Sequence, residues 1–349
     1  HCHGVHQVMK KITLSICIAT LNRAAFLNET LHSIVSQASE QVEIVIVDGA
    51  STDDTGNVVK RHQEGFPRLR YYRLEVKGGL DQDYNRAVGL AAGDYCWLFS
   101  DDDVMKPGAL QAVLDNVDKG HDLIVVNAEV RNADLSAVIE SRLLKLNSNR
   151  IYSQAEGEQF FGDTANYLSF IGAVVIRREL WLAREKEEYF GTFFVHIGVI
   201  FQSALPGSSL VIAEPLISIR YGNATWSARS FEIWMFKFPR IIWSFPHFSD
   251  ASKRRVYPKE PWKKWERLLR YRASGHYRLK EYNNLGKPMT RSPLHRLLAL
   301  TIARTPGVAV NLFVVIAAAF YGKNILMIDL KDSPFYFTRK LRKRSTFGR

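Results

Sequence analysis

Short apolar runs alternate with segments of helical periodicity along residues 12–126, and this alternation limits the possible folds more than any other feature. Such a pattern is typical of a Rossmann-like α/β fold, in which a mostly parallel sheet carries helices on both faces. The helices are expected near residues 27–38, 54–63, 81–92 and 110–117. The expected strands are Ile12–Ala19, Val42–Val47, Leu69–Leu74, Tyr95–Phe99 and Leu123–Val126.

Polar residues follow three of these strands. Thr20, Asn22 and Arg23 follow the first strand, Asp48 follows the second, and three aspartates follow the fourth. Ligands of parallel α/β sheets bind beyond the carboxyl ends of the strands. We therefore expect a binding site at this edge of the sheet.

The three aspartates, Asp101, Asp102 and Asp103, stand next to one another directly after an apolar run. Adjacent carboxylates repel one another, and a hard divalent cation such as Mg²⁺ or Mn²⁺ would offset that repulsion. The alternative is an Asp-rich turn that caps a helix starting near Pro107. The other polar strand ends favour the metal site.

Four segments carry a resemblance to the family 2 glycosyltransferases, which have the GT-A fold. The resemblance covers roughly residues 12–130 and continues more faintly through Phe170–Leu180. The segments are Ile18–Gln37, Val42–Thr55, Gly78–Tyr95 and Leu98–Leu110.

The resemblance implies a nucleotide-sugar donor and a Mn²⁺ or Mg²⁺ cofactor. Asp101 would face the ribose, and Asp102 would bind the metal that bridges the donor diphosphate, with Asp101 as a second ligand and Asp103 in support. The other donor-binding residues would be Thr20, Asn22, Arg23, Asp48 and Asp81.

The chain departs from the family at one position. The family often has a second acid after the second strand, and Gly49 stands there in this sequence. Asp48 would then make more of the contact with the base, so the identity of the base stays open.

A narrower resemblance, to the bacterial abequosyltransferases within this family, lies in Arg220–Trp226, Phe231–Trp234 and Ile241–Phe245. It implies transfer of abequose, a 3,6-dideoxyhexose, from CDP-abequose to a lipid-linked O-antigen oligosaccharide. Two alternatives remain. One is a family member that uses a UDP- or dTDP-sugar for cell-surface polysaccharide, and the other is a non-catalytic scaffold at a membrane surface. A nucleotidyltransferase is disfavoured, because Thr20–Ala25 contains no glycine.

Arg220, Asn223 and Trp226 form a group of a cation, an amide and an indole in a glycine-containing stretch. Sugars are bound by such donors and by stacking on aromatic faces, so this stretch is expected to form a loop over the donor and acceptor pocket. A capping segment at the start of a helix is the alternative.

The general base is less clear from the sequence. His196 is the nearest candidate, since imidazole titrates near working pH, although a structural histidine is the alternative. Without an obvious base, the sequence leaves both an inverting reaction and a retaining one open.

Charge divides the chain into an acidic part and a basic part. Residues 1–230 hold 22 Lys and Arg against 28 Asp and Glu, whereas residues 231–349 hold 25 against 7, a net charge of +18. We therefore expect a catalytic domain over residues 1–230 and a basic, aromatic-rich helical region over residues 231–349. The basic region either binds an anionic partner or has its charges solvated by water.

The basic region has the composition of a helix at a membrane interface. Lys253–Arg278 interleaves cations with Trp and Tyr, and the apolar pieces Leu297–Ala303 and Val308–Phe320 are too short to span a bilayer. We expect peripheral attachment to anionic lipid at the cytoplasmic face of the bacterial plasma membrane, and no nucleic-acid partner. The alternative is packing on the catalytic domain or on a second subunit, which would allow a homo-oligomer.

The three cysteines, Cys2, Cys17 and Cys96, form neither a disulfide framework nor a zinc pattern. They favour a reducing cytosol, and no leading signal peptide is expected.

Overall fold

The computed structural model describes residues 11–222 and 227–337 and divides the chain into two units. The N-terminal unit runs to Arg131 and resumes over residues 140–220. The C-terminal unit contains residues 132–139 and continues from Tyr221. The division falls at residue 220, before the boundary at residue 230 that composition suggested.

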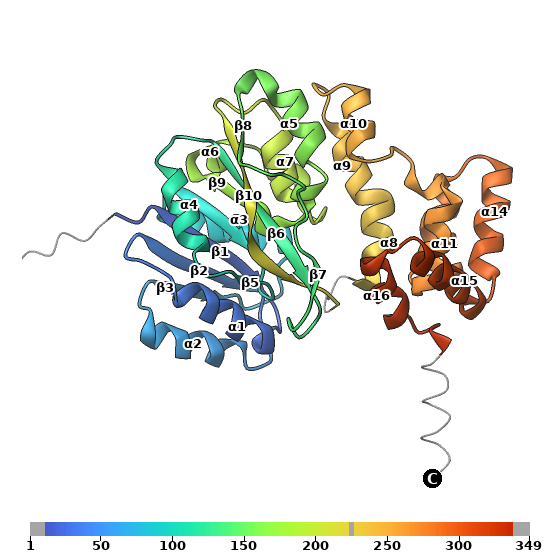
Figure 1. The fold of residues 1–349 in the computed structure, drawn as a ribbon, viewed down its shortest axis with the longest axis horizontal. Coiled ribbons are helices and arrows are strands. Elements are labelled where there is room, and N and C mark those ends of the chain that lie inside the picture. The colour runs from blue at the N-terminus through green and yellow to red at the C-terminus, as the bar shows by residue number, and fades with distance from the viewer. Residues whose placement is uncertain (1–10, 223–226, 338–349) are drawn as a thin grey trace, which may run out of the picture. The chain divides into compact units, whose positions relative to one another are not determined.

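The N-terminal unit is built on a mixed β-sheet (Figure 1). Its strands follow the order β3–β2–β1–β4–β9–β6–β10–β5, and β8 pairs with β10. The strand bounds are β1 Leu14–Thr20, β2 Val42–Asp48, β3 Leu69–Arg73, β4 Tyr95–Phe99, β5 Val104–Met105, β6 Leu123–Arg131, β7 Val138–Glu140, β8 Arg150–Tyr152, β9 Val174–Arg177 and β10 Ser209–Arg220.

The strands β3, β2, β1 and β4 are parallel neighbours, as the sequence predicted. Strand β9 runs antiparallel to both β4 and β6, which places it between two strands of the parallel set. Strand β10 is parallel to β6, while β5 and β8 are antiparallel to β10. The prediction of a mostly parallel sheet therefore holds for one half, and the sheet as a whole is mixed.

Helices alternate with these strands along the chain and pack on the faces of the sheet. The α-helices of the unit are α1 Ala24–Val35, α2 Thr55–Gly65, α3 Leu80–Leu90, α4 Ala109–Val117, α5 Gly157–Thr164, α6 Arg178–Ala183 and α7 Val195–Phe201. Short 3₁₀ turns lie at Gln154–Glu156, Tyr167–Ser169, Ile171–Ala173 and Glu187–Tyr189.

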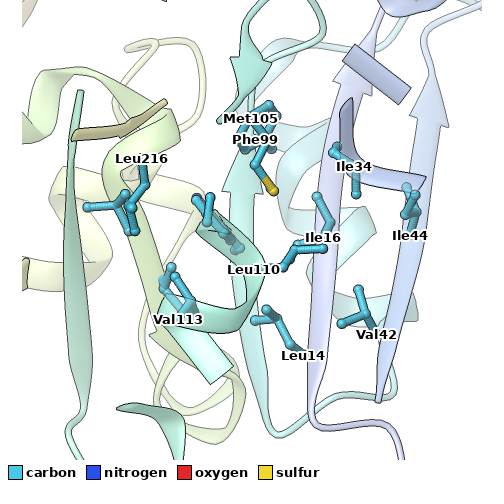
Figure 2. Close-up of a cluster of buried hydrophobic side chains, with 14 of the residues drawn as sticks. Leu14, Ile16, Ile34, Val42, Ile44, Phe99, Met105, Leu110, Val113 and Leu216 are labelled. Carbon is cyan, nitrogen blue, oxygen red and sulfur yellow. The ribbon is translucent and has the colours of Figure 1, made fainter. Parts of the chain in front are cut away.

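The central strands are buried on both faces. Leu14, Ile16 and Ile18 of β1 join one apolar cluster with residues of α1, α2 and α4 (Figure 2). The intervening side chains Ser15 and Cys17 are also buried, and α3 packs against β1 and β2. Because successive side chains of a strand point to opposite faces, helices cover both sides of the sheet, as predicted.

The C-terminal unit is helical. Its α-helices are α8 Ser230–Glu232, α9 Phe238–Ser244, α10 Asp250–Val256, α11 Trp265–Ser274, α12 Leu279–Glu281, α13 Lys287–Met289, α14 Pro293–Arg304, α15 Gly307–Phe320 and α16 Asn324–Asp332. π-Helical segments lie at Ile233–Lys237 and Tyr282–Gly286, and 3₁₀ turns at Ser227–Arg229 and Pro261–Lys263.

A buried amide holds three helices of this unit together. The side-chain nitrogen of Asn311 in α15 donates to the carbonyl oxygens of Ala273 and Leu330, each at 3.0 Å. These carbonyls belong to α11 and α16, and both also accept from Ser333, whose hydroxyl bonds to Ala273 and whose backbone nitrogen bonds to Leu330, so Asn311 and Ser333 together join the three helices.

Helices α14 and α15 leave large apolar side chains exposed. Leu294, Leu297, Phe313, Ile316 and Phe320 all project from this pair, and Phe320 is 84% exposed. Within the described parts of the chain, no helix by itself has the length and apolarity to cross a bilayer; α14 and α15 reach that length together, but are bent by 97° at their junction. The two short apolar pieces expected from the sequence are therefore present as two helices.

We predict that Gly93→Ala destabilises the N-terminal unit. Gly93 precedes β4, and a Cβ there would lie 2.8 Å from the backbone nitrogen of Ser15 and 3.0 Å from the carbonyl carbon of Leu14. Because these atoms belong to a central strand that cannot shift freely, the expected loss is about 1–3 kcal/mol, measured by urea unfolding. Gly89→Ala in α3 is the control, since a Cβ there meets nothing within 4 Å. Equal stability of the two variants would contradict this packing.

Candidate active site

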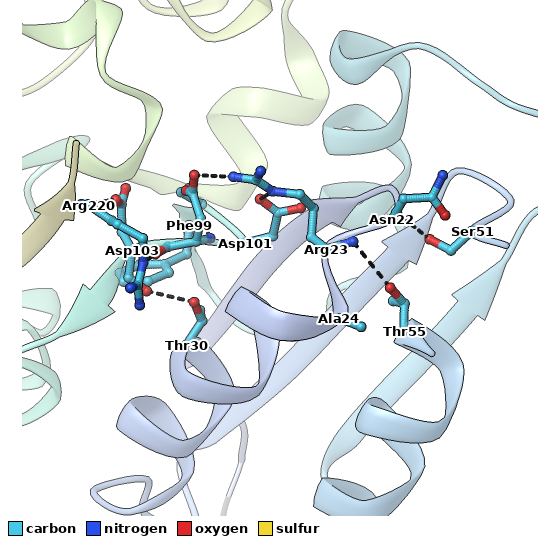
Figure 3. Close-up of polar contacts among 12 residues, drawn as sticks. Asn22, Arg23, Ala24, Thr30, Ser51, Thr55, Phe99, Asp101, Asp103 and Arg220 are labelled. Atoms are coloured by element: carbon cyan, nitrogen blue, oxygen red, sulfur yellow. Dashed lines mark hydrogen bonds and ion pairs between the residues drawn. The ribbon is translucent and has the colours of Figure 1, made fainter. Parts of the chain in front are cut away.

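The polar ends of β1, β2 and β4 lie along one edge of the sheet (Figure 3). Thr20 ends β1 directly opposite Asp48, which ends β2. Phe99 ends β4 and pairs with Ile18 of β1. The three groups of polar residues singled out in the sequence therefore share this edge, as expected.

Asn22 joins the loop after β1 to the loop after β2. Its side-chain oxygen accepts from the backbone nitrogen of Thr52 at 2.7 Å, and its own backbone nitrogen donates to the Ser51 hydroxyl at 2.8 Å. Asn22 has a φ of 54°, a conformation that asparagine tolerates better than most residues. Asn22 thus shapes the edge, and its contact with a nucleotide stays a prediction.

Asp48 is fully buried, and both carboxylate oxygens have partners. One accepts from the backbone nitrogen of Ser51 at 2.8 Å, and the other accepts from the Tyr71 hydroxyl. Burial, together with this hydrogen bond to the carboxylate, raises the pKa of Tyr71. Asp48 therefore stabilises the loop after β2 through its hydrogen bond with the Ser51 backbone.

A carboxylate from α3 fills the place beside Gly49. A Cβ on Gly49 would lie 3.3 Å from Oδ2 of Asp83, which also pairs with Arg86 at 3.3 Å. Burial raises the pKa of Asp83 to about 6; the charge of Asp48 adds to this effect and Arg86 opposes it. The chain thus has a second acid near Asp48, contributed by a helix and not by the residue after β2.

Arg23 binds the acidic loop. Its guanidinium forms an ion pair with Asp102, and its Nε lies 3.5 Å from Asp101 Oδ1. Burial and the neighbouring charge of Asp102 raise the pKa of Asp101 to about 7, although Arg23 opposes this shift. The buried Thr20 hydroxyl lies beside Asp101 but makes no hydrogen bond of normal geometry within the described residues.

Asp103 and Arg220 form the framework behind this loop (Figure 3). The buried carboxylate of Asp103 accepts from the backbone nitrogen of Arg220 at 2.9 Å, and Thr30 donates to the Asp103 carbonyl at 2.7 Å. The Arg220 guanidinium donates to the Asp102 carbonyl at 3.0 Å and pairs with Glu29 at 2.9 Å. Arg220 is thus a buried residue at the end of β10 and not a loop residue, and its contact with an acceptor stays a prediction.

Asp81 also binds backbone. Its two carboxylate oxygens accept from the nitrogens of Phe193 and Val195, at 2.9 and 3.1 Å, where α7 begins. These bonds satisfy donors that a helix start leaves free. Donor binding by Asp81 is untested, and Asn223 and Trp226 lie outside the described residues.

His196 lies inside α7 and is 1% exposed. Its Nε2 hydrogen-bonds to the Leu168 carbonyl at 2.8 Å, and burial lowers its pKa to about 4. A buried imidazole that bonds to backbone cannot reach an acceptor hydroxyl as it stands. The structure therefore favours the structural-histidine alternative over the general base.

The residues that could hold a divalent cation are Asp101 and Asp102. The raised pKa of Asp101 reflects burial and repulsion, both of which a cation would relieve, so the pair fits Mg²⁺ or Mn²⁺. No group of three or more His, Cys, Asp or Glu side chains converges among the residues in the described ranges. Such a cation would take its other ligands from donor phosphates and water, which is usual for Mg²⁺.

Sequence reasoning missed two carboxylates of this region. Asp83 stands two residues after Asp81 in the same expected helix, and the glycine at position 49 was the signal that another acid was needed. Glu29 gave no signal, because its partner Arg220 lies 191 residues away in the sequence.

We predict that Asp83→Asn stabilises the chain increasingly as pH rises. The pKa of Asp83 is about 6 in the folded chain and about 4 in an unfolded one, so the folded state binds this proton more tightly. Stability contributed by the proton is present below pH 4 and is lost as pH rises through 6. The variant should gain on the order of 2 kcal/mol relative to wild type between pH 4 and 7, measured by thermal unfolding.

The exposed Asp115→Asn in α4 is the control for this pH series. A stability difference between Asp83→Asn and wild type that stays constant across the range would contradict the raised pKa.

Comparisons with known proteins identify relatives of the chain. The family model described as Glycosyl transferase family 2 matches residues 15–178. The abequosyltransferase RfbV of Salmonella typhimurium is 30% identical over 231 residues, which cover 60% of this chain and 67% of RfbV. A Campylobacter jejuni protein named GalNAc(5)-diNAcBac-PP-undecaprenol β-1,3-glucosyltransferase is 30% identical over 109 residues, covering 31% of this chain and 35% of the relative.

Two solved structures share the fold. TarS of S. aureus, crystallised with UDP, matches with a TM-score of 0.54 at 16% identity and covers 91% of this chain and 90% of its own. The mannosyltransferase PcManGT from Pyrobaculum calidifontis, in complex with GDP-Man and Mn²⁺, gives a TM-score of 0.52 at 14% identity, covering 93% and 87%. At these identities the likeness concerns the fold alone.

Proposed function

Because the chain belongs to family 2 of the glycosyltransferases and has a GT-A-like fold, we propose that it transfers abequose from CDP-abequose to a lipid-linked O-antigen oligosaccharide. The 30% identity over 60% of the chain with RfbV, which is named an abequosyltransferase, supports abequose as the transferred sugar. The alternative within the family is a UDP- or dTDP-sugar donor for another cell-surface polysaccharide.

The observation that carries the proposal is the group of Arg23, Asp101 and Asp102 at the carboxyl edge of the sheet. Asp101 would face the ribose, and Asp102, helped by Asp101, would hold Mn²⁺ or Mg²⁺. A divalent ion held there neutralises charge that grows on the departing diphosphate. Arg23 stands beside both carboxylates and adds a second positive charge for the phosphates. A non-catalytic scaffold would have no use for this arrangement.

The base would meet the edge near Asp48 and Asp83. A carboxyl with a pKa of about 6 is mostly ionised at pH 7 and accepts a hydrogen bond from the amino group of cytosine or from the N3–H of uracil and thymine alike. The preference for a cytidine donor therefore rests on the likeness to RfbV. Thermal shifts of the protein with CDP, UDP, GDP and dTDP, each with and without Mn²⁺, test the choice, and a larger shift with UDP or dTDP would favour the alternative donors.

The burial of His196 favours the retaining alternative for the transfer step. In that reaction an oxygen of the departing diphosphate takes the proton of the acceptor hydroxyl while the new glycosidic bond forms. NMR of the product reports the anomeric configuration directly: retention of the α configuration supports this route, and inversion contradicts it.

We predict that Asp102→Asn lowers the transfer rate about 10²-fold or more while the protein stays folded. The substitution removes one anionic ligand of the proposed metal and one partner of Arg23. Initial rates with a nucleotide-sugar panel and an extracted lipid-linked acceptor, at limiting Mn²⁺, measure the effect. Asp115→Asn is the control with the same chemical change at an exposed site. Wild-type rates in Asp102→Asn would remove the basis of the assignment.

We further propose that the C-terminal unit attaches the protein to the cytoplasmic face of the bacterial plasma membrane. The net charge of +18 over residues 231–349 is complementary to anionic lipid. Exposed side chains on α14 and α15, including Leu294, Leu297 and Phe313, offer apolar area for insertion at the interface. A lipid-linked acceptor presents its sugars at that surface, so attachment would raise its local concentration.

We predict that the double variant Phe313→Glu, Ile316→Glu loses most binding to vesicles that contain anionic lipid. Two buried anions would oppose both apolar insertion and charge attraction. Co-sedimentation with anionic and neutral vesicles measures the loss, and raised salt should weaken binding by the wild type. Leu182→Glu, at an exposed leucine of α6, is the control. Concentration-dependent self-association of the wild type, with no vesicle binding, would instead support packing on a second subunit.

A further inference from the structure

The C-terminal unit contains a cavity of about 770 Å³ that is rich in cations. Arg240, Lys259, Lys263 and Arg291 line it together with one acid, Glu260. Glu260 pairs with Lys263 at 2.8 Å. Arg240, Lys259 and Arg291 have no carboxylate partner among the residues that the structure describes. The cavity therefore offers three uncompensated positive charges to an anion.

Two tryptophans form walls of the same cavity. Trp262 stacks on Phe236 with ring centroids 4.9 Å apart, and Trp243 donates its indole N–H to the Tyr257 carbonyl at 3.0 Å. The Lys259 ammonium lies 5.2 Å from the Trp243 ring. The indole nitrogen of Trp262 is buried without a hydrogen-bond partner in the described ranges. Fixed aromatic faces and free donors are features of a binding site for a phosphorylated ligand with an apolar part.

The chain passes within two residues from the cavity lining into α14, which exposes apolar side chains in its first two turns. Met289 and Arg291 line the cavity, and α14 begins at Pro293. Leu294 is 73% exposed, and its Cα lies at most about 11 Å from that of Arg291, because three residues cannot span more. Leu297 continues this exposed face one turn later. A cationic cavity and an apolar track thus adjoin within one unit.

We propose that this cavity binds the diphosphate group of a lipid diphosphate whose hydrocarbon chain lies along α14. Arg240, Lys259 and Arg291 hold the phosphate oxygens, and Leu294 and Leu297 contact the chain. The proposal rests on the proposed function for the identity of the lipid, which would be the anchor of the glycan acceptor. It assigns the lipid anchor a site in the C-terminal unit, in addition to the donor site at the carboxyl edge of the sheet.

The test uses the full chain and farnesyl diphosphate, a short lipid diphosphate, below the concentration at which it forms micelles. Binding is followed by tryptophan fluorescence and calorimetry, beside inorganic pyrophosphate and uncharged farnesol. Farnesyl diphosphate should bind more tightly than pyrophosphate alone or farnesol alone. The double variant Arg240→Gln, Arg291→Gln should weaken its binding about tenfold or more, because it removes two charged donors.

Arg254→Gln, Arg270→Gln is the matched control, since it removes the same charge from exposed positions of α10 and α11 outside the cavity. This control should change the affinity for farnesyl diphosphate less than about twofold, because exposed charges outside the cavity contribute little to binding. Leu297→Gln should weaken the binding of farnesyl diphosphate and leave the binding of pyrophosphate unchanged. Lys259→Gln is a second variant of the cavity, should the double variant fold poorly.

Equal binding by the cavity variants and the control would overturn the site. Pyrophosphate that binds as tightly as farnesyl diphosphate would assign the cavity to a free phosphate compound and overturn the lipid proposal. Equal loss of binding to phosphatidylglycerol vesicles in both double variants, without loss of farnesyl diphosphate, would mark a general membrane contact and also overturn it.

Binding of CDP and Mn²⁺ to the same variants separates this proposal from the proposed function. Unchanged nucleotide binding with lost farnesyl diphosphate binding supports both. Nucleotide binding without any farnesyl diphosphate binding in the wild type overturns the anchor site alone, and the reverse result overturns the cytidine donor of the proposed function while the anchor site stands.

Discussion

The repulsion between Asp101 and Asp102 at the end of β4 is the constraint around which the N-terminal unit is arranged. Two partly buried carboxylates at adjacent positions are unfavourable unless positive charge stands nearby. Arg23 supplies that charge from the loop after β1. Its position depends in turn on Asn22 and on the loop after β2, so three strand ends are coupled through a single electrostatic requirement.

The third aspartate has a different task, although it looks identical in the sequence. The buried carboxylate of Asp103 accepts the backbone nitrogen of Arg220, and the Arg220 guanidinium returns to the Asp102 carbonyl and to Glu29. Arg220 of strand β10 and Glu29 of helix α1 thereby stabilise the acidic loop on the side that faces the protein interior. A loop held in this way can keep charged groups at fixed positions, which is the condition for electrostatic stabilisation of a reacting group.

The parallel half of the sheet could be predicted because each element carries its own periodic signal. The expected Tyr95–Phe99 coincides with β4, and Val42–Val47 differs from β2 by a single residue. Strand β9 gave no such signal, because it spans only Val174–Arg177, and its antiparallel insertion beside β4 depends on tertiary pairing. Strand β5 is shorter still. Short strands have too few residues to show an alternation.

The sequence was enough to predict the location of the site at one edge of the sheet, but not the direction in which each side chain points. Chain order was enough to place Thr20, Asp48 and Asp101 along one line of strand ends. Whether a polar side chain faces a ligand or the framework depends on partners far away in sequence. Asp83 therefore emerged only from its position beside Gly49. The choice between a catalytic and a structural His196, which the sequence left open, depends on its packing inside α7. Sequence patterns record which residues end a strand, whereas burial of each side chain is a property of the assembled unit.

The 97° bend between α14 and α15 has a mechanical meaning for any flat surface that this pair touches. A lone amphipathic helix on a bilayer resists rolling about its own axis only through its narrow apolar face, because the roll leaves its centre in place. With a second helix fixed nearly at right angles, the same roll lifts the far end of that helix out of the interface. On any such surface an elbow of this kind would allow a single tilt of the C-terminal unit. Asn311 ties α15 to α11 and α16, and α11 also packs against α14, so both arms of the elbow are held by the same helix.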